Sequence, residues 1–292
     1  MSSDRKSESI EKSQRAATFA VVVVVSVATI AIAESKKEFR FTVGPHANVT
    51  VMNQFGPISL KPGSGNLVIV TATTHSDKVE VDQSQMGNRI DIESHLLEGA
   101  TEETGQVDYE VIAPPDASVN MHSATGLLHA ERMRGDLTME GTNPTIDVRD
   151  ITKAHVHVRT LKGPVTLTNI REGHVEVTSV SGDIQLNSVA GPLVQVSSTG
   201  GKISYNGDFG SGGDYSLISH TGDIEAAIPS DASVDVSARS VKGAVENDFA
   251  MQPKAHSRYP SVQGRSFVGT MGKAASSVVL RTFSGKIRLK QR

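Results

Sequence analysis

Apolar and polar residues alternate over much of the chain from residue 38 onward. Between Glu38 and Ile112 the alternation comes in short runs, such as FRFTV, NVTVMN and NLVIVTA, which are separated by Gly, Pro, Asn and Asp. A period of two is typical of strands with one buried face, and the separating residues favour turns. The pattern therefore predicts an all-β protein in which residues 34–112 form a short N-terminal region resembling a β-sandwich.

A short repeat follows in the second part of the chain: Ser or Thr, two residues, Gly, one residue, then Val, Ile or Leu. It occurs eight times between Ser123 and Ile287. Each interval of nine or ten residues holds one strand and one bend and leaves no room for a crossover helix. Two short strands must therefore complete each turn of about 20 residues. The repeat glycines, together with one in the related stretch IREGHVEV, are Gly126, Gly163, Gly173, Gly182, Gly191, Gly201, Gly222, Gly243 and Gly285.

These repeats predict a β-solenoid, a β-helix-like coil, in residues 113–292. One turn cannot bury its own row of Val, Ile and Leu, whereas stacked turns share a continuous core. Glycine at the bend permits either a positive φ or a close approach between neighbouring turns, and the preceding Ser or Thr can bond to nearby backbone. Stacked antiparallel sheets or a β-prism satisfy the same spacing and stay open as alternatives. Residues 251–272 interrupt the repeat, and we expect an insertion that caps or flanks the solenoid.

A second apolar position accompanies several of these glycines. It lies two residues before the glycine and is occupied by Leu161, Val180, Val189, Val241 and Phe283.

The first 33 residues have a different character. A hydrophilic leader with four basic residues precedes Ala16–Ala33, which carries no charge over 18 residues. Such a segment nearly crosses a hydrocarbon layer of about 30 Å. Ala31 and Ala33 also give it the A-x-A ending that signal peptidase accepts. Residues 1–33 are therefore predicted to be a signal peptide or a retained N-terminal membrane anchor, and the expected location is the cell envelope, periplasmic or otherwise extracytoplasmic.

Several stretches together resemble a known family. PPDASVNM at Pro114 is echoed by PSDASVDV at Pro229, S-x-x-G-x-I turns recur, and SVVLRTFSGKIRL lies near the end of the sequence. With the leading apolar segment, these features resemble a bacterial adhesin-like domain family, the domain of unknown function 4097, from about Phe39 to Leu289. The resemblance implies a cell-envelope protein with a β-helix-like repeat domain. It implies no catalytic residues.

No motif in the sequence specifies catalysis or a cofactor. The chain has no Cys and contains no G-x-S-x-G, P-loop, H-E-x-x-H or G-x-G-x-x-G motif. The best metal candidate is AHVHVRT, where His155 and His157 share one face of a strand; His174 follows, and three imidazoles could bind zinc. Asp183 and Asp223 suit turns, and no carboxylate pair shows the opposed placement of a glycosidase. A polysaccharide-active enzyme and a metal-dependent binding module stay open as alternatives.

Charge is distributed unevenly, although the formal net charge of −3 gives no indication of nucleic-acid binding. Residues 80–116 hold ten acidic residues and one basic residue, whereas nine basic and no acidic residues follow Asp248. Basic residues on a last strand discourage further strand pairing. They can also meet an anionic envelope polymer or the acidic end of another copy. The candidates for such binding are Lys254, Arg258, Arg265 and Lys273.

These observations predict an exported, envelope-associated β-repeat protein that acts by noncovalent surface contact. It would serve as an adhesin-like module or as a structural or sensing component. Neither catalysis nor a cofactor is expected. The expected partner is an envelope polymer or protein, and the membrane itself is a partner if residues 1–33 are retained.

Overall fold

The computed structural model describes residues 34–210, 212–248, 252–253 and 264–292. The predicted signal peptide or anchor at residues 1–33 lies outside these ranges, as do Lys254 and Arg258. The described residues form 24 strands and contain no helix that is long and apolar enough to cross a membrane. The prediction of an all-β protein is confirmed.

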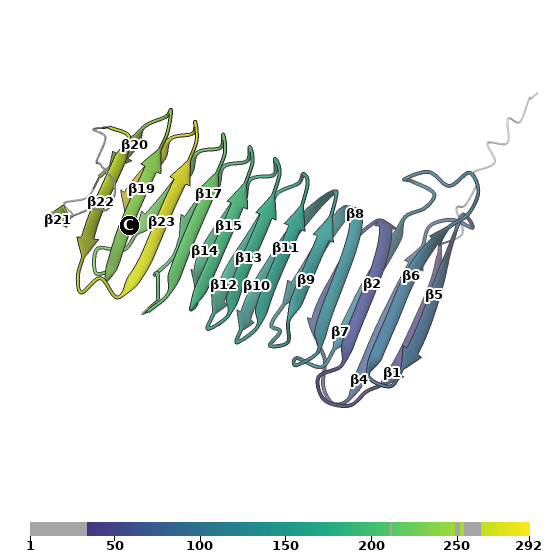
Figure 1. Cartoon of the computed structure of the whole chain (residues 1–292). Coiled ribbons are helices and arrows are strands. Elements are labelled where there is room, and N and C mark those ends of the chain that lie inside the picture. Colours follow the sequence, from purple (N-terminus) through teal and green to yellow (C-terminus); the bar gives the residue numbers. More distant parts are fainter. Residues whose placement is uncertain (1–33, 211, 249–251, 254–263) are drawn as a thin grey trace, which may run out of the picture. The chain divides into compact units, whose positions relative to one another are not determined.

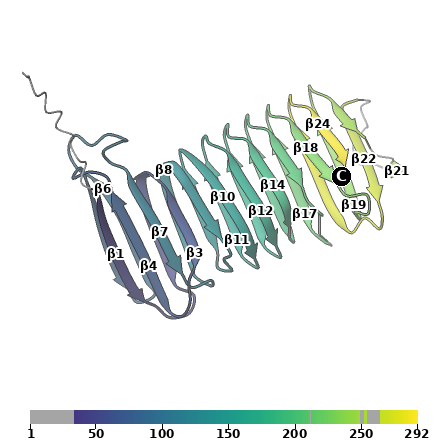
Figure 2. The same cartoon turned by 180° about the vertical axis from the view of Figure 1, so that it is seen from behind.

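The strands form two faces, A and B, in which they stack rung upon rung (Figure 1, Figure 2). In spatial order, face A contains β5 (Val79–Met86), β6 (Arg89–Leu96), β2 (Asn48–Phe55), the first half of β8 (Ser118–Glu131), β9 (Leu137–Gly141), β11 (His155–Thr160), β13 (His174–Ser179), β15 (Leu193–Ser198), β17 (Asp214–Ser219), β23 (Ser276–Thr282), β19 (Val234–Ser240), β22 (Ser266–Met271) and β21 (Gln252–Pro253). Face B contains β1 (Ser35–Thr42), β4 (Leu67–Thr74), β7 (Val107–Ala113), β3 (Ile58–Pro62), the second half of β8, β10 (Asn143–Thr152), β12 (Val165–Arg171), β14 (Ile184–Ala190), β16 (Ile203–Asn206), β18 (Ile224–Ile228), β24 (Ile287–Gln291) and β20 (Val245–Asn247).

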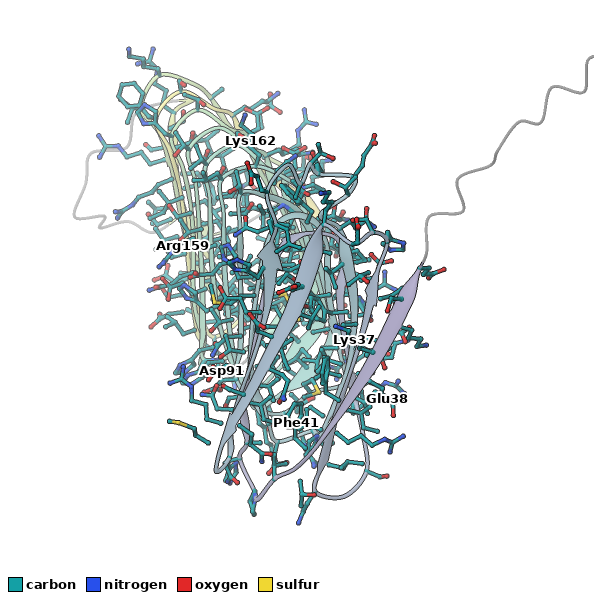
Figure 3. All side chains as sticks on the ribbon, turned by 90° about the vertical axis from the view of Figure 1, so that its right-hand side faces the viewer. Lys37, Glu38, Phe41, Asp91, Arg159 and Lys162 are labelled. Atoms are coloured by element: carbon teal, nitrogen blue, oxygen red, sulfur yellow. The ribbon has the colours of Figure 1, made fainter. Side chains whose placement is uncertain are left out.

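The two faces enclose a continuous, mostly aliphatic core. Figure 3 looks along the stack, with Arg159 on the side of face A and Lys37 on the side of face B. Burial alternates along each strand, so that Val165 and Leu167 of β12 are fully buried while Thr166 between them is not. Burying one such aliphatic side chain stabilises the fold by about 1.5–3 kcal/mol. The equivalent core positions of the next three rungs hold Ile184, Leu186, Ile203, Tyr205, Ile224 and Ala226.

Strands in the middle of the stack pair in parallel with their equivalents one turn away. Ile184 of β14 lies opposite Val165 of β12 and Ile203 of β16, which are 19 residues before and after it. Each turn contributes one strand to each face, which confirms the predicted solenoid of two short strands per turn. At the N-terminal end the pairs β1–β4, β4–β7 and β5–β6 are antiparallel and lie on the two facing sides, as in the expected sandwich-like region.

The last turn of the described chain is not the last turn of the stack. β23 pairs in parallel with both β17 and β19, and β24 pairs in parallel with both β18 and β20. A similar interleaving occurs near the N-terminal end, where β2 lies between β6 and β8 and β3 lies between β7 and β8. At both ends, therefore, strands that are neighbours in the stack come from turns that do not follow each other in the sequence. The physical gain is that an interleaved turn has backbone partners on both sides, whereas an end turn leaves one edge unpaired.

One irregularity repeats on face B. Asp150, Asn169 and Ser188 occupy equivalent places in β10, β12 and β14, and their φ values are 55°, 54° and 53°. The strand pairing skips these residues in all three strands, so the strands stay in register with one another. The left-handed residue shifts the alternation by one position, so that Ile170 turns into the core. The alternation of buried and exposed residues therefore does not keep a strict period of two along β12.

Candidate functional site

The repeat glycines form two rows, one at each corner where the chain passes between the faces. Gly173 and Gly191 belong to one corner, where Gly191 lies against Gly173. Intervals of about ten residues lead from one corner to the other, and intervals of about 20 return to the same corner. The other corner holds, in spatial order, Gly126, Gly163, Gly182, Gly201, Gly222, Gly285 and Gly243.

Close approach of neighbouring turns explains two central glycines of this row. A Cβ atom at Gly182 would lie 1.8 Å from the carbonyl oxygen of Gly163, and one at Gly201 would lie 2.0 Å from that of Gly182. Neither Gly182 nor Gly201 has a positive φ. Gly163 meets both conditions, since its φ is 91° and its Cβ would lie 2.0 Å from the carbonyl oxygen of Pro144. At Gly182 and Gly201, the stacking of the turns is therefore what requires glycine.

A buried hydroxyl closes each of these turns. The Oγ atom of Ser198 accepts a hydrogen bond from the N–H of Gly201 at 2.9 Å, and Ser219 does the same for Gly222 at 2.9 Å. Both serines are buried, so the glycine N–H groups have no route to water. The expected bond between this hydroxyl and nearby backbone is present.

We expect Ser198→Ala to lower the free energy of unfolding by about 1–3 kcal/mol, because the buried N–H of Gly201 loses its acceptor. Ser197→Ala is the matched control, since the neighbouring Ser197 lies on the exposed side of β15. The control should change the free energy by no more than about 0.5 kcal/mol. Urea unfolding of both variants measures the difference, and equal losses would contradict the role given to the buried hydroxyl.

The residue after each hydroxyl points away from the core. The exposed fraction is 52% for Leu161, 44% for Val180, 37% for Phe283 and 46% for Val241. Val189, which also precedes a repeat glycine by two residues, belongs to the opposite corner and is fully buried. Apolar residues two positions before a repeat glycine therefore lie either at an exposed turn or in the core. Four of the five face solvent.

These exposed residues belong to one row of turn tips, which form the upper edge in Figure 1 and carry Lys162 in Figure 3. Backbone hydrogen bonds continue through the tips: the N–H of Ser181 donates to the carbonyl of Leu161 at 3.0 Å, and that of Gly200 to Val180 at 2.7 Å. The row is thus held like the strands below it, and its six positions span about 24 Å at the strand spacing. We call it the turn ridge; in spatial order it consists of Leu161, Val180, Thr199, His220, Phe283 and Val241.

The ring of Phe283 makes two contacts within one part of the turn ridge. The rings of His220 and Phe283 stack with their centroids 5.0 Å apart and their planes 6° apart. The Nζ atom of Lys242 lies 4.8 Å from the centroid of the Phe283 ring, which allows a cation–π interaction. Phe283 comes from the interleaved β23–β24 turn, so the unusual order of the turns builds this part of the ridge.

Cations surround the turn ridge. The six turns contain seven Lys or Arg residues and two Asp residues, a net charge of +5 within a chain of net charge −3. Both carboxylates accept backbone N–H groups: Oδ1 of Asp183 bonds to Lys202 at 2.8 Å, and Oδ1 of Asp223 bonds to Lys286 at 2.7 Å. Three of the seven cations form ion pairs with carboxylates outside these turns, Arg159 with Glu140, Lys202 with Glu225 and Lys286 with Glu246, so the excess of positive charge along the ridge is smaller than this count. The residues counted are 159–164, 178–183, 197–202, 218–223, 239–244 and 281–286.

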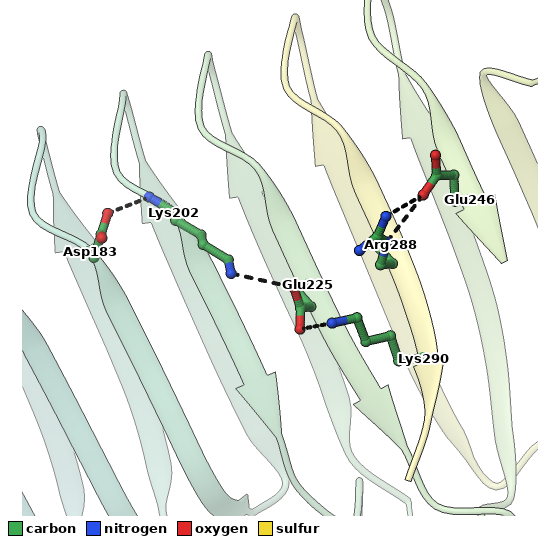
Figure 4. Close-up of polar contacts among 6 residues, drawn as sticks. All are labelled: Asp183, Lys202, Glu225, Glu246, Arg288 and Lys290. Atoms are coloured by element: carbon green, nitrogen blue, oxygen red, sulfur yellow. Dashed lines mark hydrogen bonds and ion pairs between the residues drawn. The ribbon is translucent and has the colours of Figure 1, made fainter. Parts of the chain in front are cut away.

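An ion-pair ladder lies on face B beside the turn ridge (Figure 4). The Nζ atoms of Lys202 and Lys290 lie 3.3 Å and 2.5 Å from the carboxylate of Glu225. Arg288 donates hydrogen bonds of 2.9 Å and 3.1 Å to Glu246. The hydrogen bond from Lys290 lowers the pKa of the Glu225 carboxyl. The ladder therefore links neighbouring turns, and its carboxylates already have cationic partners.

Glu225→Gln should lower the free energy of unfolding by about 1 kcal/mol or less at pH 7, because the ion pairs are partly exposed. The pKa of Glu225 is lowered in the folded state, so its contribution is present above the ordinary carboxyl pKa. The contribution is lost as pH falls through the lowered value. Thermal melts of wild type and variant should therefore converge in acid, with Glu110→Gln on an exposed position of β7 as control. A difference in melting temperature between wild type and Glu225→Gln that stays constant with pH would contradict an ion-pair contribution from Glu225.

The three candidate zinc ligands do not converge. The rings of His155 and His174 stack across neighbouring strands with centroids 4.6 Å apart, while Nδ1 of His157 lies 3.3 Å from the carboxylate of Glu176. Within the ranges that the structure describes, no group of three or more His, Cys, Asp or Glu residues is placed to hold a metal ion. The histidines take part instead in contacts between successive rungs of face A.

The described members of the basic candidate set lie apart. Arg265 precedes β22, and its Nη1 atom donates to the carbonyl of Val241 at 3.4 Å, at the end of the turn ridge. Lys273 follows β22 at the other end of that strand. β22 pairs antiparallel with β19, so only Arg265 of these two lies beside the turn ridge. Lys254 and Arg258 lie outside the described residues.

The fold and this surface define a two-faced β-solenoid with an exposed apolar edge. Residues 48–290 match the Toastrack DUF4097 family, and the chain belongs to that family. The resemblance found in the repeats and flanking stretches is confirmed.

Two solved structures are also similar. A putative cell adhesion protein from Clostridium sporogenes ATCC 15579 is 14% identical over 88% of this chain and 100% of its own, with a TM-score of 0.28. A putative adhesin from Parabacteroides distasonis ATCC 8503 is 12% identical over 88% of this chain and 97% of its own, with a TM-score of 0.30. At these scores neither likeness carries an argument. A comparison with curated proteins gave no match.

Proposed function

We propose that this chain is an exported, envelope-associated protein that acts by noncovalent surface contact through the turn ridge. The observation that carries the proposal is the exposure of Leu161, Val180, Phe283 and Val241 along one edge. Burying them within the fold would have stabilised it, yet they stand at tips that tolerate polar residues such as Thr199. Exposed apolar clusters rimmed by polar residues are typical of interaction sites.

Contact fits the chemistry of the described residues better than hydrolysis does. A glycosidase needs two opposed carboxyl groups, about 5–9.5 Å apart, on either side of a bound sugar. Here Asp183 and Asp223 accept backbone N–H groups, and Glu225 and Glu246 are held in ion pairs. This arrangement supports an adhesin-like, structural or sensing role without catalysis.

Export is supported by the sequence of the first 33 residues. The 18-residue uncharged segment after a leader with four basic residues suits a signal peptide or an anchor. Either fate would deliver the solenoid to the cell envelope, where a contact surface on its edge meets polymers, proteins and lipids.

Site-specific photo-crosslinking tests the proposal in the full chain. A photoreactive side chain at Val180 should form adducts with envelope components, because this tip lies within the turn ridge. The same probe at Gln195, an exposed position on β15 of face A, is the control and should form few adducts. Equal labelling at both positions, or none at Val180, would contradict the proposal.

A further inference from the structure

We infer that the turn ridge binds the surface of a bilayer containing anionic lipids. The inference rests on the proposed function and names the partner of the same surface. Three independent observations lead to it: the shape of the ridge, the charge around it and its limited extent along the corner.

The shape of the ridge suits a soft, flat partner. Leu161, Val180, Phe283 and Val241 stand in a single row on projecting turns, and each is 37–52% exposed. Backbone groups at the tips are already paired, as the bonds from Ser181 to Leu161 and from Gly200 to Val180 illustrate. Such tips can enter the boundary between headgroups and acyl chains without leaving those N–H groups unpaired. The row follows the stack axis, so several tips can reach one surface together.

The basic residues around the ridge favour an anionic bilayer surface. Lys162 and Lys242 stand at the tips, and Arg281 lies just below them on face A. Apolar residues flanked by Lys and Arg are typical of segments that lie in a membrane interface, where the cations meet lipid phosphates. An uncharged bilayer would offer no anionic headgroups to Lys162, Lys242 and Arg281, and an anionic polymer alone would leave the apolar tips in water.

The combination is confined to one part of the corner. Toward the N-terminal end, the positions equivalent to Leu161 hold Thr142 and Ala124, and those equivalent to Arg159 hold Glu140 and His122. Large apolar side chains at this tip position therefore begin at Leu161, and Leu127, directly after Gly126, is a further exposed apolar residue at this corner. Because the repeat itself continues through both parts, turn geometry alone does not account for the apolar tips.

Fluorescence from a single labelled cysteine tests the inference in the full chain. The natural sequence has no Cys, so Val180→Cys and Gln195→Cys each give one attachment site for an environment-sensitive dye. Each protein is reconstituted into vesicles of phosphatidylcholine alone or with phosphatidylglycerol. With phosphatidylglycerol present, the dye at position 180 should shift to the blue and be quenched by quenchers attached to the lipid chains. The dye at position 195 should show neither effect.

Two further changes sharpen the result. High salt should reduce the quenching at position 180, because screening weakens the attraction between cations and anionic headgroups. Introducing Leu161→Ser and Phe283→Ser together should reduce it to the level of position 195, because the neighbouring tips no longer enter the interface. Quenching that is equal at positions 180 and 195, or equal with and without phosphatidylglycerol, would overturn the inference.

The outcomes separate this inference from the proposed function. If the probe at Val180 forms envelope adducts in the crosslinking experiment but lipid quenchers do not reach the dye, the ridge contacts a protein or a polymer and the lipid assignment is wrong. If neither signal appears, both the lipid assignment and the contact role of the ridge are wrong.

Discussion

Replacing Gly201 with alanine should lower the free energy of unfolding by about 3 kcal/mol or more, the upper range for overpacking a rigid site. The new Cβ atom would lie 2.0 Å from the carbonyl oxygen of Gly182 in the neighbouring turn. That oxygen belongs to backbone, and backbone bonds through the tips oppose separation of the turns. The turns can relieve the clash only by giving up bonds that the stack shares.

The neighbouring residue provides a matched control. A Cβ atom at Gly200 would meet its nearest atoms at 3.6 Å and 3.7 Å, which is ordinary contact, and Gly200 has no positive φ. Gly200→Ala should therefore leave the free energy of unfolding within about 1 kcal/mol of the wild-type value or raise it slightly. Urea unfolding of the two variants gives the comparison. Similar losses for both would mean that close stacking is not what requires glycine at position 201.

Deleting residues 276–292 should unfold more of the protein than it removes. The deletion takes away β23 and β24, which lie between β17–β18 and β19–β20. The remaining strands would be separated by two strand spacings, about 9.6 Å, too far for backbone hydrogen bonds. β19 and β20 would then lose their parallel partners, and β19 would keep its antiparallel pairing with β22, so the amides of Val234–Ser240 should lose part of their protection from exchange.

Hydrogen exchange measured peptide by peptide tests this result. Deleting residues 34–42 is the control, because β1 lies at the edge of face B and, among the strands of the described residues, pairs with β4 alone. That control should expose the amides of β4 that bonded to β1 and leave β19 protected. Undiminished, wild-type protection of Val234–Ser240 in the chain that lacks residues 276–292 would contradict the structural role of the interleaved turn.

The repeats were sufficient to predict the solenoid because each glycine and hydroxyl has a local physical requirement. Gly182 marks a contact between turns, and Ser179 caps it within the same turn at 3.0 Å. Both requirements recur once per turn, so the spacing of these residues reports the length of the turn. The apolar residues after each glycine report the buried side of the strand.

Two features depend on relations that a single linear pattern does not record. The positive φ of Asn169 breaks the alternation of buried and exposed residues in β12. The place of β23–β24 is set by pairing with strands from two different turns. A gap of 42 residues between Gly243 and Gly285, twice the usual interval, was the available signal for that irregularity.

The turn ridge was missed because Leu161 and Val189 look alike in the sequence. Both are apolar and stand two residues before a repeat glycine, yet one lies at a tip and the other in the core. The preceding residue does not distinguish them, because Thr160 and Ser188 both hold the Ser or Thr position of the repeat; what differs in the structure is the positive φ of Ser188. Assigning glycines to alternate corners would have separated the two.

Oxidative footprinting of the full chain in envelope preparations tests most directly whether the turn ridge is the contact surface. Oxidation of Leu161 and Phe283 by hydroxyl radicals should fall when envelope is present. Oxidation of Met86, which is 76% exposed on β5 of face A, should not change. Equal oxidation of Leu161 and Phe283 with and without envelope would contradict the account.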